Sequence, residues 1–320
     1  MPENNFSPIS IKDLYGYENK ASKWLIDKLI PENGVAILSG ESGSYKTWLL
    51  LHIAASVAGG TPVFDTFPVQ QGKVLMIDEE NRHSLLVERL KLLGIQEDLP
   101  IQFVVKTGFD LNAGGNYIND FYNFVDKNKI KLVTFDSLVR IHGKDENNAK
   151  EMAELFRSFT TLQNLGVSVI ITHHHRKEQN KQSQRMSQML RGSSDIRAGL
   201  DSHLAVVRNG DKEVQIVQTK NRDSEEFPAF ALKIEEEDSK IKFRFNGEVV
   251  IGKKSKAKQR IMQLFEKDKT LEADRENVVS WLQDDVGVSK AGEALAELVN
   301  EKKLKERVAE HGKKFYTLVI

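Results

Sequence analysis

The run of residues with the clearest chemistry lies at positions 40–47 and reads Gly-Glu-Ser-Gly-Ser-Tyr-Lys-Thr. Two apolar runs flank it, residues 35–38 before and 48–55 after, so the loop joins a predicted strand to a predicted helix. At such a junction, successive backbone N–H groups and the dipole of the helix attract phosphate oxygens. Lys46 would reach the β- and γ-phosphates of a nucleotide, and the hydroxyl of Thr47 would bind Mg²⁺.

One position departs from the pattern usual in such loops. Tyr45 stands where glycine is expected, and we therefore expect a backbone conformation there that tolerates a side chain. The alternative is a Gly/Ser turn that ends in Lys-Thr without binding phosphate. As a phosphate loop, the run predicts the following nucleotide-binding residues: Gly40, Glu41, Ser42, Gly43, Ser44, Tyr45, Lys46, Thr47 and Trp48.

Two further apolar runs end in acidic residues. Residues 73–77 are followed by the acidic residues 78–80, and residues 131–135 are followed by Asp136. Nearly continuous apolar runs of this length are typical of parallel strands that are buried on both faces. The C-terminal ends of such strands form the edge at which open α/β sheets bind their ligands. Asp136 is therefore predicted to hold Mg²⁺, the alternative being a residue that caps the segment after it.

A fourth predicted strand, the apolar run at residues 167–171, ends in Thr172 and three consecutive histidines at 173–175. Zinc binding is not our first interpretation, because side chains alternate along a strand and we expect no carboxylate or cysteine partner near them. A polar side chain at this strand end is predicted instead to contact the γ-phosphate. His173 and His174 both fit that role, and the sequence does not choose between them.

The stretch after the histidines, residues 178–189, is polar and lacks apolar periodicity, which predicts a mobile loop. Lys177, Lys181 and Arg185 give it a basic face. That face fits nucleic-acid binding and an ordinary solvated surface equally well.

The next segment is predicted to form antiparallel strands. Residues 204–208 and 214–219 alternate between apolar and polar side chains around Asn-Gly-Asp at 209–211, a hairpin signal. The second of these strands ends in Lys220 and Arg222. A further pair of strands is predicted at residues 230–234 and 241–245.

Composition restricts the possible classes of protein. Lys plus Arg and Asp plus Glu both number 46, so any electrostatic case for nucleic-acid binding must be local. The chain has no cysteine, which excludes disulfides, thiolate metal sites and cysteine nucleophiles. The N-terminal residues lack a signal-peptide pattern and no apolar run approaches membrane-spanning length, so we expect a soluble, cytoplasmic protein.

The 320 residues suffice for one large domain and one small one. We predict a polar N-terminal segment at 1–20, an α/β domain at 21–251 that begins with a helix at 21–30, a basic linker at 252–257 and a small domain at 258–320. The small domain is predicted to contain helices at 256–266, 275–284 and 289–300, the first beginning in the linker, and a hairpin at 305–308 and 315–319. This order is typical of a winged helix, which binds DNA; the alternative is a small interaction domain of the same outline.

In order and spacing, the motifs resemble the RecA-like ATPase superfamily. The resemblance is closest to plasmid and phage replication helicases of the RepA type and more distant to DnaB-type replicative helicases. It covers residues 20–235 and rests on residues 40–47, 74–81, 132–136, 170–174, 191–194 and 220–222. The resemblance implies an α/β fold with a RecA-like, mostly parallel sheet flanked by helices.

The same resemblance implies roles for the acidic residues and the histidines. Glu80 would polarise the attacking water, with Glu79 as its competitor and Asp78 as a less favoured candidate. Asp136 would hold Mg²⁺ through water. Either His173 or His174 would sense the γ-phosphate.

For the cations, the resemblance implies action between subunits. Lys220 and Arg222 match a Lys-x-Arg element that DnaB-like proteins present to the nucleotide of the neighbouring subunit. Arg222 would be the arginine finger, Lys220 its companion and Arg191 a second candidate; the alternative for Lys220 and Arg222 is a charged strand end on the surface. Such domains assemble head to tail, which implies a homo-oligomeric ring, here a hexamer.

A ring of this type would pass single-stranded DNA through its centre, held by basic loops. The loops of this chain that match are residues 177–190 and 142–150, and neither contains an aromatic platform for bases. The sequence thus favours a Mg²⁺- and ATP-dependent replication helicase of the RepA type. One alternative is an ATP-switched DNA-binding regulator without unwinding activity. Another is a small-molecule kinase, which would leave residues 220–222 and the C-terminal domain unexplained.

Overall fold

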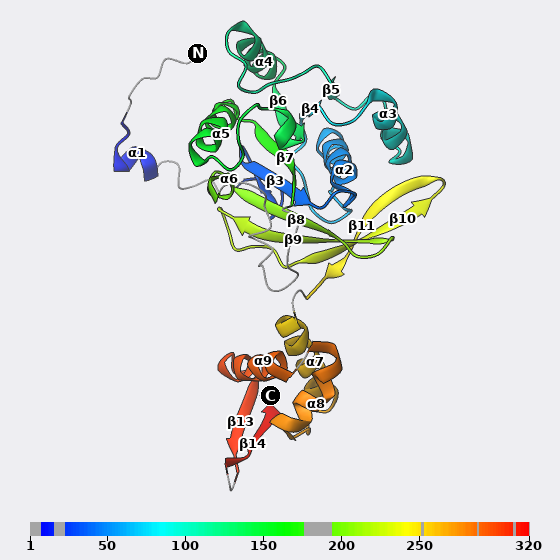
Figure 1. Cartoon of the computed structure of the whole chain (residues 1–320), viewed down its shortest axis with the longest axis vertical. Coiled ribbons are helices and arrows are strands. Elements are labelled where there is room, and N and C mark those ends of the chain that lie inside the picture. Colours follow the sequence, from blue (N-terminus) through cyan, green and yellow to red (C-terminus); the bar gives the residue numbers. More distant parts are fainter. Residues whose placement is uncertain are drawn as a thin grey trace. The chain divides into compact units, whose positions relative to one another are not determined.

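The computed structural model divides the chain into two compact units, Met1–Gly247 and Glu248–Ile320. It describes residues 8–15, 23–175, 194–250, 253–286, 288–309 and 312–319. The loop predicted at 178–189, its flanking Lys177 and the candidate finger Arg191 lie outside these residues. Each unit has a buried core of its own, and each is described by itself (Figure 1).

The larger unit is built on one sheet, to which the described residues contribute nine strands. These are β3 Val35–Gly40, β4 Lys73–Asp78, β5 Ile101–Val105, β6 Ile130–Asp136, β7 Ser168–His174, β8 Ser202–Arg208, β9 Glu213–Asn221, β10 Phe230–Glu237 and β11 Lys240–Glu248. Their order is β11-β10-β9-β8-β3-β7-β6-β4-β5. The strands from β8 to β5 pair in parallel, whereas β9 is antiparallel to β8 and to β10. The predicted α/β class with a mostly parallel sheet is confirmed.

The register of the parallel strands brings the motifs to one edge. Gly40, the last residue of β3, pairs with His174 of β7 and with Val206 of β8. Asp78 of β4 pairs with Asp136 of β6. All residues of β3 are buried, as are all but one of β6 and of β7. The strand ends therefore converge because the apolar runs before them are held in the core.

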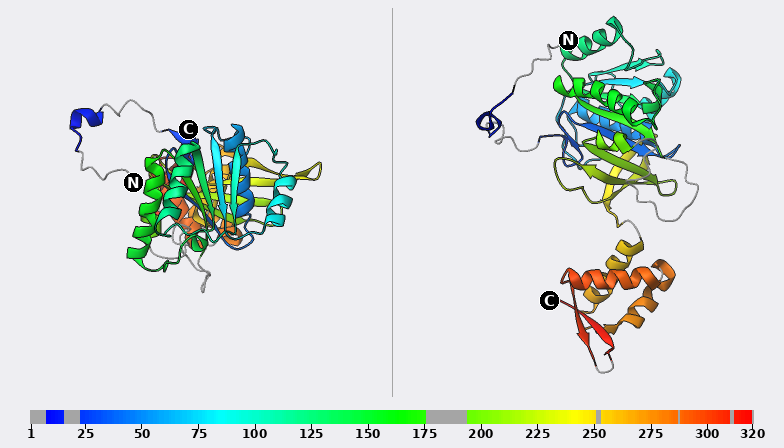
Figure 2. Two further views of the ribbon diagram at one scale, coloured as in Figure 1. Left: turned by 90° about the horizontal axis from the view of Figure 1, so that it is seen from above. Right: turned by 60° about the vertical axis from the view of Figure 1, so that its left-hand side comes forward.

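Helices cover both faces of this sheet (Figures 1 and 2). One face packs against α2 Lys46–Gly59 and α3 His83–Leu92, and the other against α4 Asn116–Lys127, α5 Ala149–Asn164 and the short α6 Ser194–Ala198. The 3-10 turn η1 Leu138–Arg140 follows β6. Helix α2 ends at Gly60, whose left-handed conformation (φ 71°) is one that glycine adopts without strain.

The helix predicted at residues 21–30 is wrong. The described part of that segment forms β1 Trp24–Ile26, a turn, and β2 Ile30–Pro31, with Trp24 paired to Pro31. Lys28 within the turn has a positive φ of 60°, which a helix does not allow. Most of the apolar side chains that indicated a helix are buried all the same, because Leu25, Leu29 and Ile30 belong to the same core as α2, whereas Trp24 is only partly buried. Upstream, Ile11–Tyr15 forms a short helix, α1, with no buried residue.

The smaller unit contains three helices and a three-stranded antiparallel sheet in its described residues. In chain order these are α7 Lys253–Lys267, β12 Ala273–Asp274, α8 Arg275–Val286, α9 Val288–Asn300, β13 Leu304–Val308 and β14 Lys314–Leu318. The sheet order is β12-β14-β13. The predicted helices and hairpin are confirmed, while the two-residue strand β12 was too short to leave a sequence signal. The three helices and the hairpin share one apolar core.

Among the described residues, no helix is long and apolar enough to cross a membrane.

Candidate functional site

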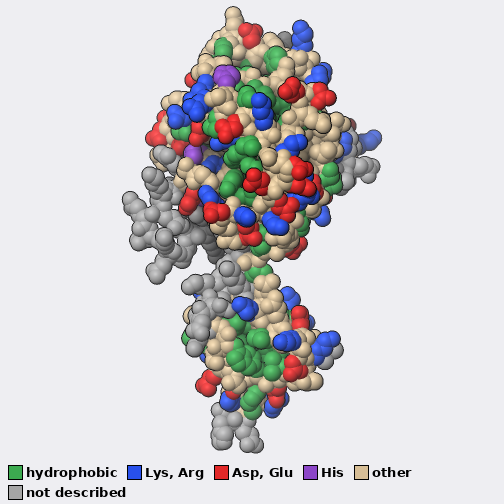
Figure 3. All heavy atoms as spheres, turned by 90° about the vertical axis from the view of Figure 1, so that its right-hand side faces the viewer, with side chains coloured by type: hydrophobic (Ala, Val, Ile, Leu, Met, Phe, Trp, Pro, Cys, Tyr) green, Lys and Arg blue, Asp and Glu red, His purple; other side chains and the backbone are tan. Residues whose placement is uncertain are grey.

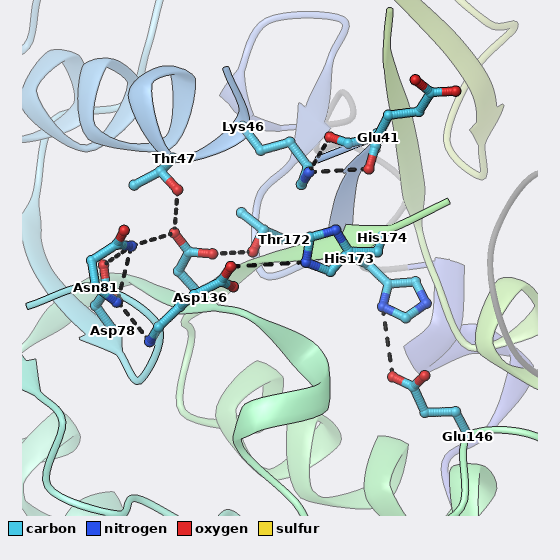
Figure 4. A network of polar contacts seen from close by, with 12 residues as sticks. Glu41, Lys46, Thr47, Asp78, Asn81, Asp136, Glu146, Thr172, His173 and His174 are labelled. Carbon is cyan, nitrogen blue, oxygen red and sulfur yellow. Dashed lines mark hydrogen bonds and ion pairs between the residues drawn. The ribbon is translucent and has the colours of Figure 1, made fainter. Parts of the chain in front are cut away.

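The predicted phosphate loop joins β3 to α2. Its lysine lies folded back on the loop, with the Nζ of Lys46 donating to the carbonyl oxygens of Gly40 (3.0 Å) and Glu41 (2.8 Å) (Figure 4). Lys46 is 8% exposed. Burial lowers the pKa of the ammonium group, and the nearby carboxylates of Asp136 and Glu80 oppose that shift. A buried cation held only by neutral carbonyls is well placed to take a phosphate as a stronger partner.

Two backbone positions explain the shape of the loop. A Cβ on Gly40 would lie 2.8 Å from the carbonyl oxygen of Val206 in β8, so only glycine fits there. Tyr45 has φ 68° and ψ 12°, which is the left-handed region that glycine favours. The expected side-chain-tolerant backbone at this position is therefore not found. The Tyr45 ring instead packs edge-on against Phe243, and the guanidinium group of Arg208 lies over it at 5.4 Å, contacts that offset the strain.

Oxygen atoms gather at the metal end of the site. The Oγ1 of Thr47 donates to one carboxylate oxygen of Asp136 at 2.6 Å, and the Oγ1 of Thr172 donates to the other at 2.5 Å. Burial and then the charge of Asp78 raise the pKa of Asp136 to about 6. A hydroxyl and a carboxylate that meet at one point fit Mg²⁺, which prefers oxygen ligands.

The three acidic residues after β4 have different surroundings. Asp78 is buried and accepts hydrogen bonds from the backbone and side chain of Asn81. Glu79 is occupied by the loop after β5, because it accepts from the backbone N–H groups of residues 107, 108 and 109 and from the Thr107 hydroxyl. Glu80 alone of the three lines the pocket at the phosphate loop. This geometry favours Glu80 over its competitors as the residue that faces the attacking water.

The two candidate sensor histidines also differ in what they face. His174 lies on the pocket, and its Nε2 is 3.9 Å from a carboxylate oxygen of Glu80. His173 is 2% exposed, and its Nδ1 is 3.7 Å from the buried carboxylate of Glu146 (Figure 4). We expected no carboxylate near the three histidines. That expectation is wrong, because Glu146 lies beside His173. The described residues still contain no group of three His, Cys, Asp or Glu that could hold a metal ion.

Lys220 and Arg222, at and just beyond the end of β9, lie outside this pocket. The Nζ of Lys220 donates to the carbonyl oxygens of Arg197 (2.7 Å) and Ala198 (3.1 Å) of α6. Arg222 donates to the carbonyl oxygen of Ala198 at 2.9 Å and forms an ion pair of 2.9 Å with Asp201. Its side chain remains 54% exposed. Within one subunit the two cations are therefore held by their own chain and do not reach its nucleotide pocket.

The pocket at the phosphate loop has a volume of about 340 Å³. Three of its lining residues were not predicted from the sequence, namely Asn81, Arg89 and Arg208. Arg89 donates to Asn81 and lies 5.4 Å from the ring of Trp48, one of the predicted binding residues. Arg208 ends β8, which pairs in parallel with β3 but was predicted only as part of an antiparallel hairpin, so its place at the pocket edge was not recognised. Arg89 lies within α3 and left no local signal in the sequence.

Fold and phosphate loop together define the class, a RecA-like P-loop ATPase. Residues 2–180 match the family described as an AAA domain (AAA_25), and because they make up more than half of the chain, the protein belongs to that family. No curated protein matches the chain. A solved structure described as "The Structure Of A DnaB-Like Replicative Helicase And Its Interactions With Primase" is similar, with a TM-score of 0.56 over 74% of this chain and 68% of that one. At 14% sequence identity, this likeness shows a shared fold.

Proposed function

We propose that the protein hydrolyses ATP with Mg²⁺ and that hydrolysis drives action on DNA. The observation that carries this proposal is the convergence of Lys46, Thr47, Asp136 and Glu80 on one pocket at the C-terminal edge of the parallel sheet. Phosphoryl transfer to water requires a positioned cation, oxygen ligands for a metal and a carboxylate that faces the pocket. Membership of the AAA family supports the same reaction class.

In the proposed reaction, Lys46 exchanges its carbonyl partners for the β- and γ-phosphates, while the N–H groups of the loop bind the remaining phosphate oxygens. Thr47 and Asp136 hold Mg²⁺, which supplies positive charge to the phosphate oxygens. Glu80 orients a water molecule and accepts its proton. His174, beside Glu80, is the proposed contact to the γ-phosphate, since His173 faces Glu146 instead.

Lys220 and Arg222 are proposed to act on the nucleotide of a neighbouring subunit. Their distance from their own pocket and the exposure of Arg222 support this role. A head-to-tail contact that closes on itself forms a ring. We therefore infer a homo-oligomeric ring, in which each interface brings one subunit's nucleotide against the next subunit's cations.

A replication helicase of the RepA type is the form of this function that we favour. The similar solved structure, a DnaB-like replicative helicase, supports it at the level of the fold. On the face of the larger unit that Figure 3 shows, basic and acidic side chains are interspersed. The DNA contacts that we propose therefore lie in local loops. In the proposed DNA-facing segment 142–150, Lys144 is paired with Glu154, whereas Lys150 is exposed to solvent.

A second candidate function is an ATP-switched DNA-binding regulator. The smaller unit favours it, because three helices followed by a hairpin are typical of winged-helix DNA-binding domains, and a processive motor does not need one. The hairpin carries the exposed Lys313 and Lys314. Lys313 is paired with the buried Asp274, whereas Lys314 is paired with the more exposed Glu306 and can be released to phosphates at small cost. Helix α9, proposed for the major groove, shows a less favourable charge, because its exposed Lys290 is paired with Glu293.

Three assays on the full chain separate these functions. The first measures ATP hydrolysis with and without single-stranded DNA, the second measures displacement of a labelled strand from a forked duplex, and the third measures binding to duplexes of defined sequence. A helicase gives DNA-stimulated hydrolysis together with displacement. Binding to a duplex of defined sequence without displacement selects the regulator. Hydrolysis that ignores DNA, together with neither displacement nor duplex binding, would contradict both.

A further inference from the structure

A row of polar side chains runs obliquely across the sheet, from the edge that holds the nucleotide pocket toward the opposite edge. The Oγ of Ser39 in β3 lies between two imidazoles, 2.9 Å from Nε2 of His175 and 2.7 Å from Nε2 of His203. The other ring nitrogen of His203, Nδ1, lies 2.5 Å from Oγ1 of Thr219. The row thereby connects four neighbouring strands, from the end of β7 through β3 and β8 to β9.

The middle of this row is enclosed by the core. Ser39 and His203 are each 0% exposed, and His175 is 7% exposed. Burial lowers the pKa of His175 to about 4, with a contribution from the charge of Lys46, and lowers that of His203 to about 3. Both rings are therefore neutral at neutral pH, and each has one N–H donor and one bare nitrogen acceptor.

Hydrogen-bond donors and acceptors must follow one another in a fixed order along this row. Ser39 has one hydroxyl proton, so it donates to one imidazole and accepts from the other. If His203 donates from Nε2 to Ser39, its Nδ1 must accept from Thr219. If Nε2 accepts from Ser39, its Nδ1 must donate to Thr219. The hydrogen bond at Thr219 is thus determined by the one at Ser39, and the row has two arrangements that reverse as a unit.

The two ends of the row lie at the two functional elements. Ser39 directly precedes Gly40, whose carbonyl oxygen accepts from Lys46 at 3.0 Å and from the backbone N–H of His175 at 3.2 Å. Thr219 directly precedes Lys220 in β9. Binding of phosphate by Lys46 removes a donor from the Gly40 carbonyl, and so changes the surroundings of Ser39 and His175 together.

We propose that Ser39, His203 and Thr219 are positioning residues that transmit the state of a subunit's phosphate loop to β9, and so place Lys220 and Arg222 for the neighbouring nucleotide. This inference rests on the proposed function, since it takes that pair to act between subunits. It assigns each subunit a hydrogen-bonded connection between its own nucleotide and the cations that it presents to the next subunit. The alternative is that the row only satisfies buried polar groups.

Mixed oligomers of two inactive variants test this connection. A donor subunit carrying Glu80→Gln keeps its finger but cannot activate water, and an acceptor subunit carrying Arg222→Ala keeps its site but has no finger. ATP hydrolysis by the mixture then reports acceptor sites that face a donor's Arg222. Thr219→Val, which preserves shape and deletes the hydroxyl, is placed first in the donor and then in the acceptor, and Thr219→Ser in the donor restores the hydroxyl.

We expect Thr219→Val in the donor to lower the rate of the mixture about tenfold, the worth of one well-placed hydrogen bond. The same change in the acceptor should alter the rate by less than about twofold, because that subunit has no finger to position. Thr219→Ser in the donor should retain the parent rate. Ser39→Ala in the donor, which interrupts the row between its two imidazoles, should act like Thr219→Val.

Controls keep the test clear. Thr134→Val in the donor deletes another buried threonine hydroxyl, one with no hydrogen-bond partner among the described residues, and should leave the rate unchanged. Thermal unfolding of each variant shows whether it is folded.

Equal effects of Thr219→Val in donor and acceptor, or no effect in the donor, would overturn the positioning role while leaving the proposed function intact. A parent mixture without activity would overturn the action of Arg222 between subunits, and the positioning role with it.

Discussion

Two groups of charged side chains, at opposite edges of the sheet, differ in how complete they are as sites. Lys46 and Asp136 are 8% and 4% exposed and already meet the groups that position them, including Thr47 and Thr172. Arg222, at the end of β9, is 54% exposed and is held by a backbone carbonyl and by Asp201 of its own chain. The first group is a preorganised site, and the second is a pair of cations without a substrate in its own subunit. The comparison supports the proposal that two subunits share one site.

The largest effect is expected from the residue proposed to activate water. Glu80→Gln should lower kcat about 10³-fold while ATP affinity is retained, because a positioned base contributes roughly 10²–10⁴-fold. Steady-state hydrolysis and binding of a fluorescent ATP analogue measure the two quantities.

Glu79→Gln is the matched control, because Glu79 accepts hydrogen bonds from residues 107–109 instead of facing the pocket. It should keep kcat within about threefold and cost about 1–2 kcal/mol of unfolding free energy, since charge-assisted hydrogen bonds are lost. If Glu79→Gln abolished hydrolysis and Glu80→Gln did not, the assignment within this pair would be reversed.

Asp136→Asn should separate activity from stability. It removes a ligand proposed for Mg²⁺, so hydrolysis should fall about 10²-fold. The folded-state pKa of Asp136, about 6, exceeds its unfolded value, so its stabilising contribution is present at low pH and is lost as pH rises through 6. At pH 7 without Mg²⁺, the variant should therefore be more stable by up to about 3 kcal/mol. A lower thermal midpoint in metal-free buffer would contradict this explanation.

Because His203 is buried in the sheet, we expect the free energy of unfolding to fall in acid. The pKa of His203 in the folded state is about 3, below its unfolded value near 6.5, so stability is full above pH 6.5 and is lost as pH falls toward 3. Urea unfolding at several pH values between 7 and 4 measures this loss. His203→Gln should reduce the slope by about 1.4 kcal/mol per pH unit below pH 6.5. Identical slopes for the two proteins would show that His203 is not neutral in the folded state.

The smallest effect concerns the phosphate loop. Tyr45→Ala removes the ring contacts and keeps the left-handed strain, whereas Tyr45→Gly removes both. The glycine variant should therefore be more stable than the alanine variant by about 1 kcal/mol, the reverse of their usual order at a helix start. Thermal unfolding of the two variants compares them directly, and a more stable alanine variant would rule out strain at Tyr45.

Much of the larger unit's sheet was predictable from the sequence because parallel strands are buried on both faces. Long apolar runs mark β4, β6 and β7, and the residues that follow them share one edge for that reason alone. The helix predicted at residues 21–30 was wrong because a short hairpin can bury apolar side chains at the same spacing as a helix. Strand β12 has only two residues, too few to show a period.

Site residues were predictable where they belong to motifs that are contiguous in the sequence. Lys46, Thr47, Glu80 and Asp136 belong to short local motifs at strand ends and line one pocket. The row from His175 through Ser39 and His203 to Thr219 depends on contacts between strands that are far apart in the sequence. No local pattern marks Ser39, which reads as one small polar residue before a glycine.

The most direct test of a shared site is the rate of ATP hydrolysis per subunit across a wide range of protein concentration, for the wild type and for Arg222→Ala, with and without single-stranded DNA. A finger supplied by a neighbour accelerates hydrolysis by roughly 10³–10⁵-fold. We predict that the wild-type rate per subunit climbs with concentration and rises with DNA, and that the variant stays near the dilute-limit rate although it binds ATP. A wild-type rate that is independent of concentration and unchanged by loss of Arg222 would contradict a site shared between subunits.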